Sequence, residues 1–111
     1  MRQLSKTQAH QLRELCQAII ALESVDECRR FLTDLCTPGE LTALADRWQV
    51  ARLIEDGVPY RRIYEKTGVS TATVTRVARA LSYGEGGYRA ALGKAGKSLV
   101  ATSSITKEQD L

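Results

Sequence analysis

The residues best suited to chemistry in this chain are basic side chains that gather in one short stretch. Between positions 57 and 79 there are five basic residues and one acidic residue, a net charge of +4, whereas the whole chain carries +3. The five are Arg61, Arg62, Lys66, Arg76 and Arg79. A concentrated positive charge on a small protein favours a polyanionic partner, although a basic run can also be only a solvated face. The charge pattern therefore favours nucleic acid as the partner but does not decide the matter.

The same stretch has the pattern of a helix-turn-helix. Gly68 supplies the positive φ that a tight turn between two helices requires, and Ser70 is a favourable N-cap for the second helix. Apolar residues at helical spacing would hold the two helices together: Ile63, Val69, Val74, Ala78 and Leu81. The motif alone is not specific, because Gly68 could be an ordinary helix stop and the threonines that follow it are poor helix formers.

The second helix of this motif leaves a short-chained, hydroxyl-rich and basic face uncovered. Such a face can approach base edges closely, while its arginines reach guanines or phosphates. We therefore predict that it enters the major groove of double-stranded DNA, and that basic residues of the preceding helix contact flanking phosphates. The predicted DNA-binding residues are Arg61, Arg62, Lys66, Ser70, Thr71, Ala72, Thr73, Thr75, Arg76 and Arg79.

Helical spacing and capping signals predict an all-α domain over residues 1–92. Thr37 and Glu40 form a capping-box pattern around Pro38, which predicts a strong helix start, and Gly57 predicts the end of that helix. A second capping-box pattern is formed by Ser24 and Glu27. The predicted elements are two N-terminal dimerisation helices within 6–36, a long helix over 38–56, the helix-turn-helix over 60–82 and one short turn or helix at 88–92.

Two further expectations concern the long helix and the end of the chain. The long helix is expected to turn an apolar face inward, made of Leu41, Leu44, Ala45, Trp48, Ala51 and either Leu53 or Ile54. Residues 93–111 are small, polar and without a repeating apolar pattern, which predicts a flexible C-terminal tail.

Composition disfavours several classes of protein. No apolar stretch approaches the length of a membrane span and no signal peptide is visible, so we expect a cytoplasmic protein without membrane contact. Three cysteines without a CxxC pair and one histidine predict reduced thiols, no metal and no cofactor. The cysteines are expected to be small buried hydrophobic residues. No Cys/His pair, paired carboxylates or phosphate-binding glycine loop is present, so an enzyme is disfavoured.

Residues 10–92 resemble the tryptophan-repressor superfamily, and more closely its YerC/YecD branch. The matching residues are Thr37-Pro38-Gly39-Glu40, Arg47, Gly57, the run Ala72-Thr73-Val74-Thr75-Arg76 and the exit Leu81-Ser82-Tyr83-Gly84. The resemblance implies an intertwined all-α homodimer whose two recognition helices enter successive major grooves. It therefore implies a sequence-specific transcriptional regulator, such as a repressor, that binds a palindromic operator.

The residues themselves also favour a dimer. The apolar faces of the helices within 6–36 are buried only if another surface covers them, and a domain of this size has little core of its own. Helix-turn-helix proteins commonly pair so that two recognition helices meet a two-fold symmetric site.

The resemblance further implies a candidate effector pocket at Thr37, Arg47, Arg76, Val77 and Ala80. Tryptophan-binding members have glycine and serine at the positions of Val77 and Ala80. Valine would occupy the volume of the indole ring and alanine lacks the hydroxyl, so we predict a regulator that does not respond to tryptophan. The sequence does not decide whether another small molecule acts as the effector. The alternative function is a protein-interaction adaptor that uses the same helical corner against a transcription or replication partner.

Overall fold

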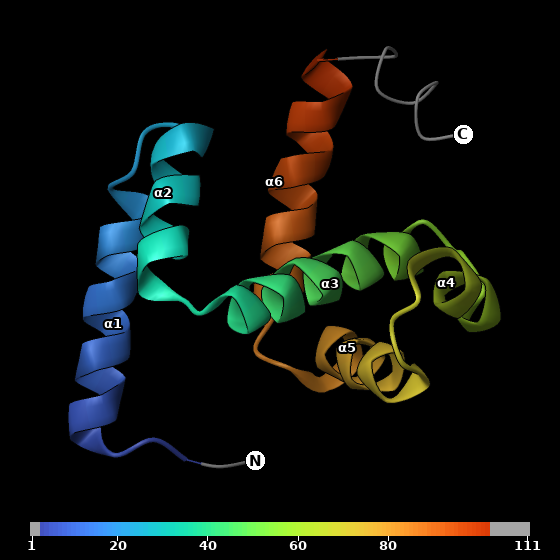
Figure 1. The fold of residues 1–111 in the computed structure, drawn as a ribbon, viewed down its shortest axis with the longest axis horizontal. Helices are drawn as coiled ribbons and strands as arrows, with labels where there is room; N and C mark the ends of the chain where they lie inside the picture. The colour runs from blue at the N-terminus through green and yellow to red at the C-terminus, as the bar shows by residue number, and fades with distance from the viewer. Residues whose placement is uncertain (1–2, 103–111) are drawn as a thin grey trace. The chain divides into compact units, whose positions relative to one another are not determined.

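The structure, a computed structural model, describes residues 3–102, and this part of the chain is entirely helical (Figure 1). Its elements are α1 (Lys6–Ile20), α2 (Val25–Leu35), α3 (Pro38–Glu55), α4 (Tyr60–Thr67), α5 (Thr71–Tyr83) and α6 (Gly87–Thr102). The predicted all-α class is confirmed. The chain divides into two compact units, Met1–Thr42 and Ala43–Leu111, which are described separately.

The N-terminal unit is held locally by helix caps rather than by a buried core. Ser5 and Gln8 form a complete capping box at α1, with N···O distances of 2.9 and 3.1 Å. At α2 the backbone N–H of Glu27 donates to Ser24 Oγ at 3.0 Å, but the Glu27 carboxylate accepts from the backbone N–H of Glu23. The predicted reciprocal box at Ser24 is therefore only half formed. Neither α1 nor α2 contains a fully buried residue.

The start of α3 has the predicted capping box. The backbone N–H of Thr37 donates to Glu40 Oε1 at 2.8 Å, and the backbone N–H of Glu40 donates to Thr37 Oγ1 at 3.2 Å. The backbone N–H of Thr37, with a smaller contribution from its side chain, holds the pKa of the Glu40 carboxyl below its usual range, because hydrogen bonding favours the charged form.

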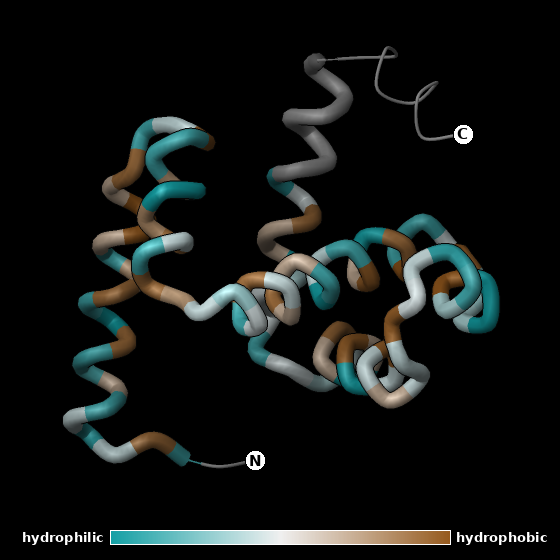
Figure 2. Tube along the Cα trace, viewed as in Figure 1, coloured by the Kyte–Doolittle hydropathy of each residue, from teal (hydrophilic) through white to brown (hydrophobic). Residues whose placement is uncertain are grey.

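The core of the C-terminal unit lies where α3, α4 and α5 meet. Its buried members are Val50, Ala51, Ile63, Val69, Val74, Val77 and Leu81. The predicted apolar set of the helix-turn-helix is thus confirmed, with Ala78 half-buried. Hydrophobic positions recur at intervals along each helix rather than in one long run (Figure 2), and no helix of the described chain is long and apolar enough to cross a membrane.

The predicted inward face of α3 is partly wrong. Val50 is fully buried although the prediction omitted it, whereas Leu44 keeps 44% of its surface exposed. Val50 was omitted because α3 carries apolar residues on two neighbouring faces, at a helical rotation of about 100° per residue. Leu44 lies on the same side as Ala51 but two turns nearer the start of α3, where the helices of the C-terminal unit do not cover it.

The predicted boundary of a C-terminal tail at residue 93 is also wrong, because α6 continues to Thr102. The start of α6 is anchored to the core by Tyr88 and Leu92, and Arg89 forms an ion pair with Glu55 of α3. A glycine inside a helix costs only about 1 kcal/mol, so Gly93 does not stop a helix anchored in this way. The remainder of the predicted tail, residues 103–111, lies outside the described part of the chain.

The end of α5 depends on a glycine for space. A Cβ at Gly84 would lie 2.5 Å from the carbonyl oxygen of Ala80, whereas a Cβ at Gly87 would meet no atom within 4 Å. We expect Gly84→Ala to lower the free energy of unfolding by about 1–3 kcal/mol, since a close contact with backbone must be relieved. Gly87→Ala is the matched control. Urea denaturation measures both variants, and equal stabilities would contradict the packing of this turn.

Candidate nucleic-acid interface

The turn between α4 and α5 is fixed by a local network of hydrogen bonds. Gly68 has a φ of 73° and donates its N–H to Tyr64 O, as the predicted turn requires. Thr67 Oγ1 donates to Ile63 O at 2.7 Å and accepts from Val69 N at 3.1 Å. Ser70 caps α5 by accepting from Thr73 N at 3.2 Å. The sequence analysis identified Gly68 and Ser70 but missed Thr67, whose hydroxyl closes the turn.

The predicted recognition face of α5 is the side turned away from the core. Val74, Val77 and Leu81 fix the other side of the helix. Of the predicted contact residues on α5, those that are exposed are Thr71, Ala72, Thr75, Arg76 and Arg79. Ser70 Oγ also donates to Thr73 Oγ1 at 3.0 Å, and Thr73 is half-buried. These two hydroxyls therefore already serve the helix cap, which leaves the exposed five as the stronger candidates.

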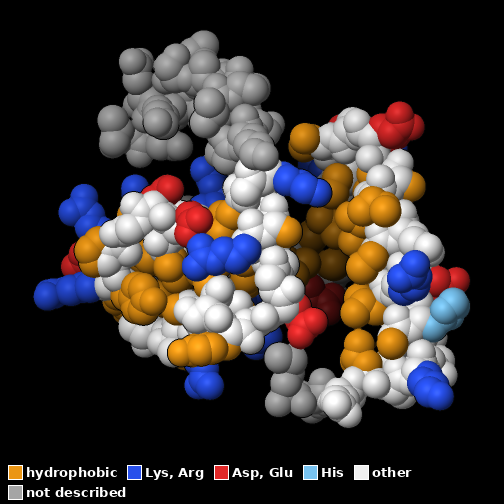
Figure 3. Space-filling view, turned by 180° about the vertical axis from the view of Figure 1, so that it is seen from behind, with side chains coloured by type: hydrophobic (Ala, Val, Ile, Leu, Met, Phe, Trp, Pro, Cys, Tyr) orange, Lys and Arg blue, Asp and Glu red, His pale blue; other side chains and the backbone are white. Residues whose placement is uncertain are grey.

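The basic side chains around this motif are available for an anion. Arg61 lies 3.9 Å from Glu65, and its side chain is 91% exposed, so this ion pair is weak. Within the described chain no salt bridge involves Arg62, Lys66, Arg76 or Arg79. Figure 3 shows Lys and Arg side chains projecting from the C-terminal unit. The motif thus combines exposed positive charge with short polar side chains.

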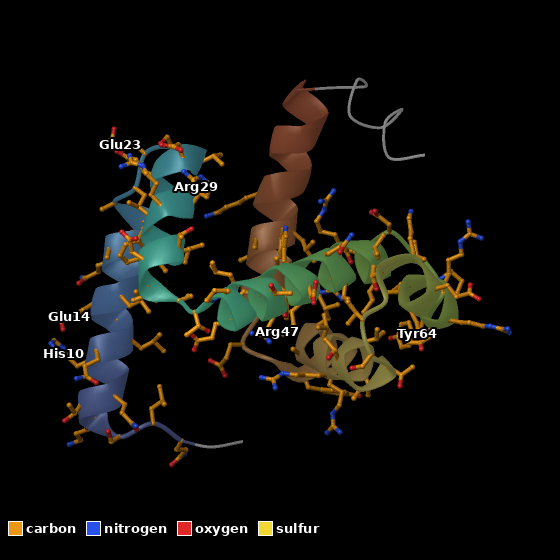
Figure 4. All side chains as sticks on the ribbon, in the orientation of Figure 1. His10, Glu14, Glu23, Arg29, Arg47 and Tyr64 are labelled. Carbon is orange, nitrogen blue, oxygen red and sulfur yellow. The ribbon has the colours of Figure 1, made fainter. Side chains whose placement is uncertain are left out.

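The five residues of the candidate effector pocket have different environments. Thr37 belongs to the N-terminal unit, and its hydroxyl is engaged in the cap of α3. Arg47 is half-buried on α3 (Figure 4), and Arg76 is exposed. Val77 is only 1% exposed and belongs to the core, while Ala80 is half-buried. The effector pocket stays a prediction. The side chain of Val77 is packed in the core and does not line an open space.

Three exposed tyrosines were missed by the sequence analysis as candidates for contact. Tyr60 and Tyr64 of α4 are 52% and 48% exposed, and Tyr83 at the end of α5 is 84% exposed. For Tyr60 and Tyr64 the sequence does offer a signal: they are four residues apart, which places them on one side of a helix that also carries Arg61 and Arg62.

The cysteines do not have the predicted burial. Cys16 is exposed, and Cys28 and Cys36 are half-buried. All three lie in the N-terminal unit, where α1 and α2 leave their apolar sides open. No group of three histidine, cysteine or acidic side chains that would suit a metal occurs in the part of the chain that the structure describes.

Comparison with known proteins agrees with this architecture. The sequence profile of the Trp repressor protein family matches residues 10–95. The uncharacterized protein YerC of Bacillus subtilis (strain 168) is 40% identical over 102 residues, covering 92% of this chain and 98% of YerC. The chain therefore belongs to the Trp repressor family.

Two solved structures have the same fold. A crystal structure of a candidate Trp repressor from Staphylococcus aureus superposes with a TM-score of 0.77 at 40% identity, covering 86% of this chain and 96% of that one. A TrpR-like protein from Eubacterium eligens ATCC 27750 gives a TM-score of 0.73 at 40% identity, covering 78% and 90%. The family is one of regulators rather than enzymes, and membership suggests a DNA-binding regulator.

Proposed function

We propose that this protein is a sequence-specific transcriptional regulator that binds a palindromic operator as a homodimer. The observation that carries the proposal is the recognition face of α5. The core fixes the helix through Val77 and its neighbours, while Arg76 and Arg79 project into solvent without an ion-pair partner in the described chain. A helix presented in this way suits the major groove, where arginine recognises guanine and short side chains approach base edges.

The open apolar surface of the N-terminal unit supports the dimer. Large hydrophobic side chains exposed there are Leu4, Leu12, Ile19, Ile20, Val25 and Leu35. Ile20 and Val25 keep 81% and 87% of their surfaces exposed. Figure 3 shows hydrophobic side chains gathered over these helices. An apolar patch of this kind marks an interface, and the family's two-fold DNA sites favour a second copy of the chain as its occupant.

Selection from a random-sequence duplex library tests the proposed function. The purified full chain is expected to enrich an inverted repeat whose half-sites are centred about 10 base pairs apart or a multiple of that, since two identical recognition helices would enter successive grooves. Enrichment of no motif, or of a single half-site without symmetry, would contradict operator binding by a homodimer.

We also expect DNA binding to be insensitive to L-tryptophan. Val77 is packed in the core, so an indole ring would have to displace a fixed side chain, at a cost of about 1–3 kcal/mol or roughly 5- to 150-fold in affinity. Calorimetry at millimolar L-tryptophan should give no saturable heat, and operator affinity should not change. A saturable signal, or a gain in affinity with tryptophan, would show that the pocket opens.

The double variant Val77→Gly with Ala80→Ser is the reciprocal experiment. If volume is the obstacle, weak tryptophan binding should appear. The variant also removes a buried side chain and places glycine inside α5, so its unfolding must be measured in parallel. A folded double variant that still binds no tryptophan would mean that the site differs from the tryptophan-binding members in more than these two positions.

A further inference from the structure

The exposed tyrosines of α4 have free hydroxyl groups. Tyr60 and Tyr64 each keep about half of their surface exposed. Neither hydroxyl makes a hydrogen bond to any residue that the structure describes. A tyrosine on a protein surface offers a rigid ring with a polar tip, which loses little conformational entropy when it binds a partner.

The two tyrosines lie together on one flank of α4. Successive helical residues are rotated by about 100°, so Tyr60 and Tyr64 follow one side of the buried Ile63, while Arg62 and Lys66 follow the opposite side. Arg61 lies beyond the tyrosines on the outward face. Figure 4 shows Tyr64 on the side of α4 nearer to α5. The half-buried Thr67, whose hydroxyl accepts from Val69 N in the turn leading to α5, lies on this same side of α4. Both observations indicate that the tyrosine flank, rather than the Arg62 flank, is the one nearer to α5.

We propose that Tyr60 and Tyr64 donate hydrogen bonds to DNA phosphates beside the groove that α5 enters, and that Arg62 and Lys66 do not contact this duplex. The inference rests on the proposed function and changes its predicted set of contacts. Tyrosine hydroxyls are among the donors that proteins use to phosphate oxygens, and such contacts set the position of a protein on the duplex. The positive charge of Arg61 beside the tyrosines complements the negative charge of the phosphates. The same charge would repel a partner protein with a basic surface.

A neutral donor has a distinctive effect on DNA binding. Each phosphate neutralised by lysine or arginine releases counterions and steepens the dependence of affinity on salt. A phenolic hydroxyl neutralises nothing, so its loss lowers affinity without changing the slope of log affinity against log salt. Its loss also weakens binding equally on all sequences, because phosphates carry no direct sequence information.

The test uses Tyr60→Phe/Tyr64→Phe in the full chain. The duplexes are one selected by the parent protein and a mixed-sequence duplex of the same length, both fluorescently labelled. The double variant is expected to bind both at least about tenfold more weakly, since hydrogen bonds to charged groups are the strong ones, with an unchanged salt slope. Arg61→Ala should flatten the slope by about one unit. The matched charge control is Arg29→Gln/Arg30→Gln on α2, with an expected loss below about threefold because remote charges are screened. Arg62→Gln/Lys66→Gln tests the second half of the proposal: the salt slope should stay unchanged, and a slope flattened by about two units would mean that both residues contact the duplex.

Each contrary outcome has a separate meaning. If Tyr60→Phe/Tyr64→Phe binds like the parent while Arg76→Ala is weakened, the tyrosine inference is wrong and the proposed function stands. If Tyr60→Ala/Tyr64→Ala also leaves DNA binding intact, neither the rings nor the hydroxyls of the pair contribute to DNA binding, and the inference is again overturned. If the parent binds no duplex, both fail. The phenylalanine variant keeps both aromatic rings and removes only the hydroxyl groups. If its thermal unfolding curve matches that of the parent, a loss of DNA affinity cannot be attributed to unfolding.

Discussion

Replacing Arg76 and Arg79 together with alanine is expected to lower affinity for a selected duplex by about 30-fold or more. Each lost arginine contact to a base or phosphate costs about 1–3 kcal/mol, and both residues lie on the exposed face of α5. Neither belongs to the core, so the fold should survive the change. Fluorescence anisotropy with a labelled duplex measures the affinity, and circular dichroism confirms the helical content.

The single variants Arg76→Ala and Arg79→Ala show whether each arginine contacts a phosphate or a base. Loss of a phosphate contact should weaken binding equally on all sequences and flatten the salt slope by about one unit, whereas loss of a base contact should relax specificity at one position. The paired control is Arg29→Ala/Arg30→Ala, which removes two exposed arginines of α2 that pair with Asp26. An equal loss of affinity in the control would mean that only total charge matters, and the assignment of α5 as recognition helix would then be wrong.

The second large effect is expected in the N-terminal unit. Leu12 and Ile19 of α1 are seven residues apart and share one exposed apolar side of the helix. Leu12→Glu/Ile19→Glu should abolish the dimer, because it places charges in a surface that the proposed interface desolvates. Sedimentation should give a mass of twice 12.2 kDa for the parent at micromolar concentration, and a monomer or an unfolded chain for the variant.

A control keeps this prediction specific to the apolar side. Gln17→Glu adds a negative charge to the opposite side of the same helix, and it should leave the dimer intact. A parent protein that sediments as a folded monomer would contradict the dimer outright. A dimer that survives Leu12→Glu/Ile19→Glu would place the interface elsewhere.

The helices could be predicted from the sequence because their ends are fixed by local chemistry. Thr37 and Glu40 satisfy each other's backbone N–H groups, Ser70 accepts from Thr73, and Gly68 takes the left-handed conformation. Such signals depend only on residues three or four apart, so one sequence is enough to find them.

The errors share one cause, which is dependence on tertiary packing. The pattern of α3 has two apolar neighbouring faces, and only the fold decides that Val50 is covered while Leu44 is open. The extension of α6 depends on Tyr88 and Leu92 meeting the core and on Arg89 meeting Glu55, residues 34 positions apart. Local propensity could not supply these contacts.

The helical corner that carries the candidate site was predicted from the sequence, whereas the contacts of the site with DNA stay a prediction. The basic motif and the cap of α5 follow from the sequence, but the double role of Thr73 and the burial of Val77 do not. The tyrosines of α4 were passed over because their exposure is a property of the folded corner. Tyrosine is intermediate in its tendency to be buried, so the sequence alone did not show that Tyr60 and Tyr64 would be exposed.

Equilibrium binding of the unmodified protein to DNA over a range of salt concentrations tests the central claim most directly. We predict that the protein binds its selected duplex at least about 10³-fold more tightly than a mixed-sequence duplex. Affinity for both should fall steeply as salt rises from about 50 to 200 mM, because basic side chains displace counterions from phosphates. Affinity that is indifferent to salt, or equal for the two duplexes, would contradict a sequence-specific DNA-binding regulator.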